Sequence, residues 1–217
     1  MSFAPWQALK REWMLYHLGD PRFRFMWEPA PADEWVSLDC ETTGLNVQKD
    51  DIIAIGAVRI AGDRIVASER LELLVRPERA VVTADSARVH GLRAADVADG
   101  LPIDEALQRL MRFIGSRPLV GYFLEFDLAM INRAIFPMLG VPLPQPRHEV
   151  SAMFHDWKFR QLPPYQQQGN VNIDLRFATM MNELALPLRH AHDALNDAVM
   201  AALAFIKLRH LLLKPSR

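Results

Sequence analysis

Residues 35–45 read W-V-S-L-D-C-E-T-T-G-L, an apolar stretch that ends in two acids and a short polar turn. A run of β-branched, aromatic and aliphatic residues bounded by a glycine-containing segment is typical of a β-strand. Alternate side chains of a strand point to opposite faces. Asp39 and Glu41 therefore share one face, and Leu38 and Cys40 share the other. The stretch predicts a core strand that delivers two carboxylates to one place.

The two acids of this strand require an explanation, because burying a carboxylate without a partner is costly. Hard oxygen ligands at this spacing suit Mg²⁺ or Mn²⁺. A strand end that reaches solvent accounts for Asp39 and Glu41 equally well, so the pair alone leaves both interpretations open. Cys40 between them is best interpreted as a small buried hydrophobic residue.

The sequence around this strand alternates between strand and helix patterns. Apolar stretches at 51–60 and 64–75 are separated by Ala61-Gly62-Asp63, a hairpin signal. Apolar residues at helical spacing over 103–114 precede a short apolar run at 118–123 that is typical of a buried strand. Further helices are expected at 125–139, 174–186 and 193–213. This alternation predicts an α/β fold.

Two segments lie outside the alternation. Residues 1–34 combine a short helical pattern with three later prolines, which favours an extension packed on a single domain that spans 35–213. Residues 140–172 are rich in Pro and Gln, and we expect them to contain a loop that borders the substrate cleft. Residues 149–154 within this segment are a candidate for one more strand.

Composition narrows the class of protein. A single cysteine precludes an intrachain disulfide and favours a reducing compartment. The net charge of −1 argues against a strongly basic coat that binds nucleic acid without specificity. The longest apolar run, residues 198–206, is far shorter than the roughly 20 residues that span a bilayer, and the N-terminus lacks a signal-peptide pattern. We therefore expect a soluble, cytoplasmic protein with no membrane partner.

Two more acids and two histidines are candidates for chemistry. Asp127 follows the predicted strand 118–123 at the start of a helix, where capping alone would explain it. His192 and Asp197 lie about 140° apart if both are helical, and then share a face poorly. If Asp193 is the N-cap, His192 lies just before the helix and can reach the pocket that Asp197 enters. A structural, hydrogen-bonded histidine is the alternative for either His192 or the nearby His190.

In combination these residues match a known order of motifs. The chain reads D-C-E-T-T-G-L at 39–45, F-D at 126–127 and H-D-A-L-N-D-A at 192–198. This order resembles the DEDDh exonucleases, the family of the proofreading epsilon subunit of bacterial DNA polymerase III and of ribonuclease T. The resemblance covers roughly residues 35–210, and His90-Gly91-Leu92 is similar to a His-Gly stretch that the family carries between its first two motifs.

The resemblance implies a fold and a site. The fold is α/β and ribonuclease-H-like: a central mixed five-stranded sheet flanked by helices, with three antiparallel strands followed by parallel ones. The implied ligands of two Mg²⁺ or Mn²⁺ ions are Asp39, Glu41, Asp127 and Asp197. The implied general base is His192. The positions that match contacts to the 3′-terminal nucleotide are Thr42, Thr43 and Leu45.

The resemblance also implies an activity, with two alternatives. The leading interpretation is 3′-to-5′ hydrolysis of single-stranded DNA to nucleoside 5′-monophosphates, by a free-standing or DNA polymerase-associated enzyme. RNA 3′-end trimming is the second, and Thr42 favours DNA because oligoribonucleases usually carry Met at that position. The third is a catalytically idle module that binds nucleic-acid ends, but all five catalytic positions are filled.

The second motif departs from the family pattern. Epsilon-like proteins commonly read His-Asn-Ala-x-Phe-Asp where this chain has Y-F-L-E-F-D at 122–127. The aspartate is retained, but two polar positions are now Tyr122 and Phe123. Either ring could stack on a nucleobase. Core packing is the other interpretation, and a position on a buried strand favours it.

Overall fold

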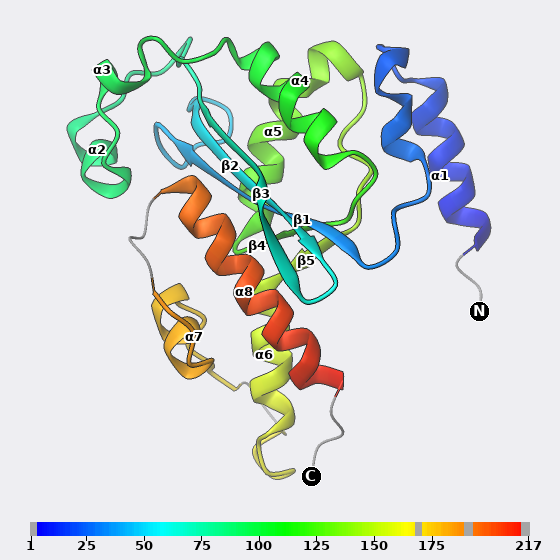
Figure 1. Cartoon of the computed structure of the whole chain (residues 1–217), viewed down its shortest axis with the longest axis vertical. Helices are drawn as coiled ribbons and strands as arrows, with labels where there is room; N and C mark the ends of the chain where they lie inside the picture. Colours follow the sequence, from blue (N-terminus) through cyan, green and yellow to red (C-terminus); the bar gives the residue numbers. More distant parts are fainter. Residues whose placement is uncertain (1–3, 168–170, 189–192, 214–217) are drawn as a thin grey trace.

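The structure is a computed structural model that describes residues 4–167, 171–188 and 193–213. Within these ranges the strands form one sheet of five, in the order β3-β2-β1-β4-β5 (Figure 1). Their bounds are β1 Glu34–Thr42, β2 Ile52–Ala61, β3 Arg64–Leu74, β4 Leu119–Gly121 and β5 Arg147–Glu149. β1, β2 and β3 pair antiparallel, whereas β4 pairs parallel with β1 and with β5. The expected mixed five-stranded sheet and the 61–63 hairpin are confirmed.

β1 is the central strand of the sheet, so its side chains reach a helical layer on each face. Val36, Leu38 and Cys40 all belong to one buried core cluster, as the period-2 pattern predicts. Asp39 and Glu41, which alternate with these residues along β1, are partly exposed and do not belong to that cluster. The alternation of the first strand therefore separates the apolar core from the two acids.

Helices cover both faces of the sheet (Figure 1). The first cluster joins β1 to the helices α1 Ala4–Tyr16, η1 Pro21–Trp27, α4 Ile103–Ile114 and α5 Leu124–Leu139. The second joins the opposite face to α6 Val150–Arg160, α7 Phe177–Glu183 and α8 Ala194–Leu213. Two short helices, α2 Ala84–His90 and α3 Ala94–Val97, follow β3. Among the residues that the structure places, no helix has the length and apolar character needed to cross a bilayer.

Three local expectations differ from the structure. Residues 150–154 are helical rather than a strand, because β5 ends at Glu149 and its carboxylate caps α6 by accepting the N–H of Ser151. α7 begins at 177 rather than 174, because the carboxylate of Asp174 holds a turn by accepting the N–H of Arg176. The short helices α2 and α3 were not expected, since neither is long enough to show a helical period.

Gly56 allows α8 to lie directly on the sheet. It pairs with Asp39 in the β1–β2 register. A Cβ atom at this position would lie 2.2 Å from backbone atoms of Ala194 and Leu195, far inside normal contact distance. Because those atoms are backbone, they cannot rotate away as a side chain would. The missing side chain at Gly56 thus sets how closely the first turn of α8 approaches the acids of β1.

We predict that Gly56→Ala lowers the free energy of unfolding by about 1 to 3 kcal/mol, the usual cost of overpacking a core. The added methyl group must push the first turn of α8 away from β2. Urea unfolding followed by circular dichroism measures the change. An unaltered midpoint would show that α8 can shift without cost, and that Gly56 does not set its position.

Candidate active site

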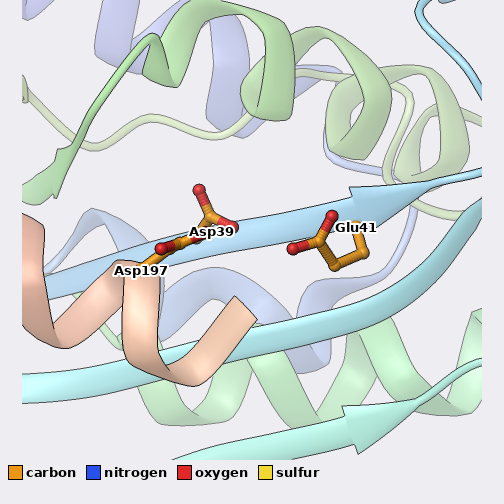
Figure 2. A group of neighbouring side chains, drawn as sticks. All are labelled: Asp39, Glu41 and Asp197. Atoms are coloured by element: carbon orange, nitrogen blue, oxygen red, sulfur yellow. The ribbon is translucent and has the colours of Figure 1, made fainter. Parts of the chain in front are cut away.

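Three carboxylates gather where β1 passes the first turn of α8. Asp39 and Glu41 come from β1 and Asp197 comes from α8 (Figure 2), and one oxygen of each lies within 4.8 Å of the others. The strand fixes the first two on one face, and the close approach at Gly56 brings the third across from the helix. Three of the four residues that the sequence predicts as metal ligands therefore lie in one group in the folded chain.

Asp127, the fourth proposed ligand, is held beside this group in a different way. It lies in the first turn of α5 with 5% of its surface exposed. Its Oδ1 accepts the backbone N–H of Cys40 at 3.1 Å. The N-cap position of α5 is occupied by Phe123 rather than Asp127, and this carboxylate oxygen of Asp127 ties α5 to the central strand.

The first turn of α8 is capped by Asp193, as one of the two geometries considered requires. Asp193 precedes the helix and caps it, because its carboxylate accepts the N–H of Asn196 at 2.8 Å and its carbonyl oxygen accepts that of Asp197 at 2.9 Å. His190 and His192 lie outside the described residues. The assignment of His192 as the general base therefore remains a prediction.

The acids of the site repel one another and are poorly solvated. Burial, followed by the charges of Asp127 and Asp197, holds the pKa of Asp39 well above its ordinary value. Burial and the neighbouring acids raise the pKa of Glu41 to about 7. Burial likewise raises the pKa of Asp127 to about 8, against the opposing effect of the Cys40 N–H. A site with these properties favours protons or cations over the bare carboxylates.

A cavity of about 1260 Å³ opens over the acids. Its wall includes Asp39, Glu41, Asp127 and Asp197 together with Thr42, Thr43 and Leu45, so every described residue proposed from the sequence lines one space. The hydroxyl of Thr42 donates to the carbonyl of Gly44 at 2.7 Å, and that of Thr43 donates to Asp50 at 3.1 Å. These bonds shape the loop that follows β1. Leu45 at its tip is 86% exposed.

Three further features at or near this cavity lie outside the predicted set of site residues. Glu149 lines it and accepts the N–H groups of Phe123 and Leu124, at 3.0 and 2.8 Å, so that it caps α5 from a neighbouring strand. Asp193 adds negative charge near Asp39 and Glu41. The rings of Tyr122, Phe123 and Phe177 form an aromatic wall. The acid pair of the H-D-A-L-N-D motif was a signal for Asp193, but nothing local marked Glu149 as a cap.

A mixed five-stranded sheet in this order, with two acids near the end of its central strand, is the ribonuclease-H-like arrangement. A family model described as exonuclease, RNase T, matches residues 36–205. The chain belongs to this exonuclease family.

Similar proteins agree with this assignment. The chain is 31% identical over 182 residues to a DNA polymerase III subunit epsilon-like protein of Rhodobacter capsulatus, an alignment that covers 82% of this chain and 24% of that protein. It is 29% identical over 174 residues to the PolC-type DNA polymerase III of Thermotoga maritima, over 80% of this chain and 12% of that protein. The chain thus spans a quarter or less of the length of these two relatives.

The fold also resembles a solved exonuclease. The structure of an E. coli ExoI complex with single-stranded DNA superposes with a TM-score of 0.67 at 15% identity, covering 84% of this chain and 41% of that one. At this identity the likeness concerns the fold, and it confirms the ribonuclease-H-like arrangement of sheet and helices.

We predict that the protein without metal loses stability as pH rises. The folded state holds the proton of Glu41 up to about pH 7, whereas the unfolded chain releases it near its ordinary pKa of 4.5. This stabilising contribution is complete below about pH 4.5 and is lost as pH rises towards 7. Asp127 extends the loss to about pH 8.

Thermal melting in chelator tests this expectation. Glu41→Gln cannot ionise, so its melting temperature should exceed that of the wild type at about pH 8, with a smaller difference near pH 5. Glu105→Gln is the control, because Glu105 is an exposed residue of α4 that does not line the cavity. Parallel wild-type and Glu41→Gln curves across this range would contradict the raised pKa.

Proposed function

We propose that this chain is a 3′-to-5′ exonuclease that releases nucleoside 5′-monophosphates from the ends of single-stranded DNA. The observation that carries the proposal is the carboxylate group of Asp39, Glu41 and Asp197, whose ligand oxygens lie within 4.8 Å of one another inside a large cavity. Membership of an exonuclease family supports the reaction class. Relatives named as DNA polymerase III proteins favour DNA over RNA as the substrate.

The donor set fits divalent cations. Carboxylate oxygens are the ligands that Mg²⁺ and Mn²⁺ prefer. The raised pKa values of Glu41 and Asp127 indicate that no described side chain of the bare protein offsets their charge. We assign two ions to the four acids Asp39, Glu41, Asp127 and Asp197. Two bound ions can activate an attacking water and stabilise the leaving 3′ oxygen.

The side chains of the protein supply the rest of the reaction. Neutral His192, whose ordinary pKa lies near 6.5, accepts the proton of the attacking water as the water oxygen bonds to phosphorus. The bond from phosphorus to the 3′ oxygen breaks, that oxygen takes a proton from solvent water, and the shortened strand leaves with a 3′ hydroxyl. Exposed Leu45 and the loop held by Thr42 and Thr43 position the terminal nucleotide.

Two broader assignments belong to the same proposal. Residues 35–213 form the exonuclease domain and residues 1–34 an extension packed on it, which is supported by the burial of Phe23, Met26 and Trp27 in the first core cluster. Association with a DNA polymerase is the second, and it rests on the names of the relatives.

Removal of any one metal-binding acid tests the site. We predict that Asp39→Ala, Glu41→Ala, Asp127→Ala and Asp197→Ala each lower the rate by several orders of magnitude without unfolding the protein, because each removes a ligand from a crowded acidic group. The measurement is hydrolysis of labelled single-stranded DNA and RNA in Mg²⁺, Mn²⁺ or chelator.

The outcomes of this assay separate the alternatives. RNA cut faster than DNA would make the protein an RNA 3′-end trimmer, and no hydrolysis by the wild type would make it a binding module. Near wild-type turnover in one variant would remove that residue from the ligand set. Mn²⁺ at about 100 times its Kd should also raise the unfolding free energy of the wild type by about 2.7 kcal/mol.

A second prediction concerns the general base. His192→Ala should lose about 10²- to 10⁴-fold in rate, the usual contribution of a positioned base. The stabilisation by Mn²⁺ should persist, because His192 is not assigned as a ligand. His190→Ala is the matched control and should be mild. A crippled His190→Ala beside a nearly silent His192→Ala would require the base to be reassigned.

A further inference from the structure

The residue at the N-cap of α5, Phe123, has an unusual backbone conformation for a bulky side chain. Phe123 follows β4 and adopts a left-handed backbone conformation with φ of 51°. Its side chain lines the cavity over the acids and is 57% exposed, although β4 before it is buried. A bulky residue rarely adopts this conformation, and asparagine accepts it more readily. The core-packing interpretation is therefore wrong for Phe123, since its ring is not in either core cluster.

Neighbouring groups hold Phe123 in this conformation. The carboxylate of Glu149 accepts the N–H of Phe123 at 3.0 Å and that of Leu124 at 2.8 Å. The same carboxylate accepts the hydroxyl of Ser151 at 2.8 Å, so it cannot turn away freely. Unfavourable backbone conformations that are held in this way concentrate at ligand-binding sites.

The ring of Phe123 is supported from behind. Tyr122 lies between Phe123 and Phe177, with ring centroids 4.5 and 4.6 Å from them. The hydroxyl of Tyr122 donates to the carbonyl of Leu175 at 2.8 Å, which fixes the middle ring. Tyr122 therefore packs against the second core cluster as well as lining the cavity, whereas Phe123 belongs to neither cluster and is the more exposed ring.

The acidic lining of the cavity limits which part of a nucleic acid it can attract. Seven acids line it, and no lysine or arginine does so among the described residues: Asp39, Glu41, Asp85, Glu125, Asp127, Glu149 and Asp197. Such a wall repels the phosphates of a nucleic acid, so side-chain cations cannot supply the local attraction. Among the described lining residues, the exposed apolar and aromatic side chains can instead contact the uncharged bases.

We propose that Phe123 is the surface on which a nucleobase near the 3′ end stacks. The inference rests on the proposed function and adds a substrate-binding residue to it. A phenyl ring offers no hydrogen bond, so the contact requires a base but does not distinguish one base from another. Its contribution depends little on salt, because it neutralises no phosphate.

Binding to single-stranded oligonucleotides with and without an abasic site tests the contact. The abasic nucleotide is placed in turn at each of the last three positions, and Kd is measured by fluorescence anisotropy with Ca²⁺ replacing Mg²⁺, the integrity of the DNA being checked on a gel. For the intact oligonucleotide, Phe123→Ala should weaken binding by about 5- to 100-fold, the range of one base stacked on an aromatic side chain.

The interaction between variant and oligonucleotide distinguishes stacking from a structural role. At one of the three positions, the abasic oligonucleotide should bind the wild type and Phe123→Ala equally weakly, because the partner of the ring is already absent. Phe123→Ala keeps its Cβ and so leaves the backbone preference largely unchanged. Phe123→Trp should restore binding or strengthen it, and should do so equally at low and high salt.

Phe136→Ala is the matched control. Phe136 is on the same helix and 58% exposed, but it does not line the cavity, so its removal should leave both affinities unchanged. Equal weakening of intact and abasic DNA by Phe123→Ala at all three positions, or no weakening, would overturn the base contact.

The hydrolysis assay separates this inference from the proposed function. If the protein hydrolyses DNA but Phe123→Ala affects intact and abasic DNA equally, the base contact is rejected and the proposed function stands. If Phe123→Ala weakens binding of intact DNA only, but the protein hydrolyses no DNA, the proposed function is rejected and the base contact stands. A wild type that binds neither oligonucleotide rejects both.

Discussion

The backbone of α8 lies against Gly56 of β2, in space that one methyl group would fill. The site depends on this contact, because Gly56 is paired with Asp39 on the neighbouring strand. The first turn of α8 can therefore bring Asp197 beside the acids of β1. On the other face, the N–H of Cys40 binds the carboxylate of Asp127 and ties α5 to the same strand. β1 is thus the common support of all four acids.

This arrangement has an electrostatic cost that the fold does not relieve by itself. Burial and mutual repulsion raise the pKa values of Asp39, Glu41 and Asp127. Groups of this kind concentrate at functional sites, since a purely structural ion pair would leave its acid with a lowered pKa. Glu34 is such a case within the same chain, because Arg117 holds the pKa of its carboxylate below the ordinary value. The contrast supports the proposal that the acids of the cavity bind cations.

The same acidity shapes how a polyanion can be held. The cavity is lined by the acids and by two exposed apolar side chains. Leu45 comes from the motif at 39–45, and Phe123 comes from the segment at 122–127. In the proposed mode of binding, metal ions bind the reacting phosphate, and the apolar side chains contact the bases. Glu149 joins the two functions, because it adds charge to the cavity while it fixes the backbone of Phe123.

The sequence by itself determined the central strand, its two acids, the hairpin and the long helices α4, α5 and α8, because apolar periodicity is a local property of the chain. It also gave the motifs of the exonuclease family through residues at 39–45, 126–127 and 192–198. Only the tertiary structure decided which acids meet, since Asp39 and Asp197 are brought together by the packing of α8 on Gly56. The exposure of Phe123 was likewise undetermined, because it follows from a left-handed residue held by Glu149, 26 positions away in the sequence. Contacts of this range leave no period in the sequence, and only the folded chain creates them.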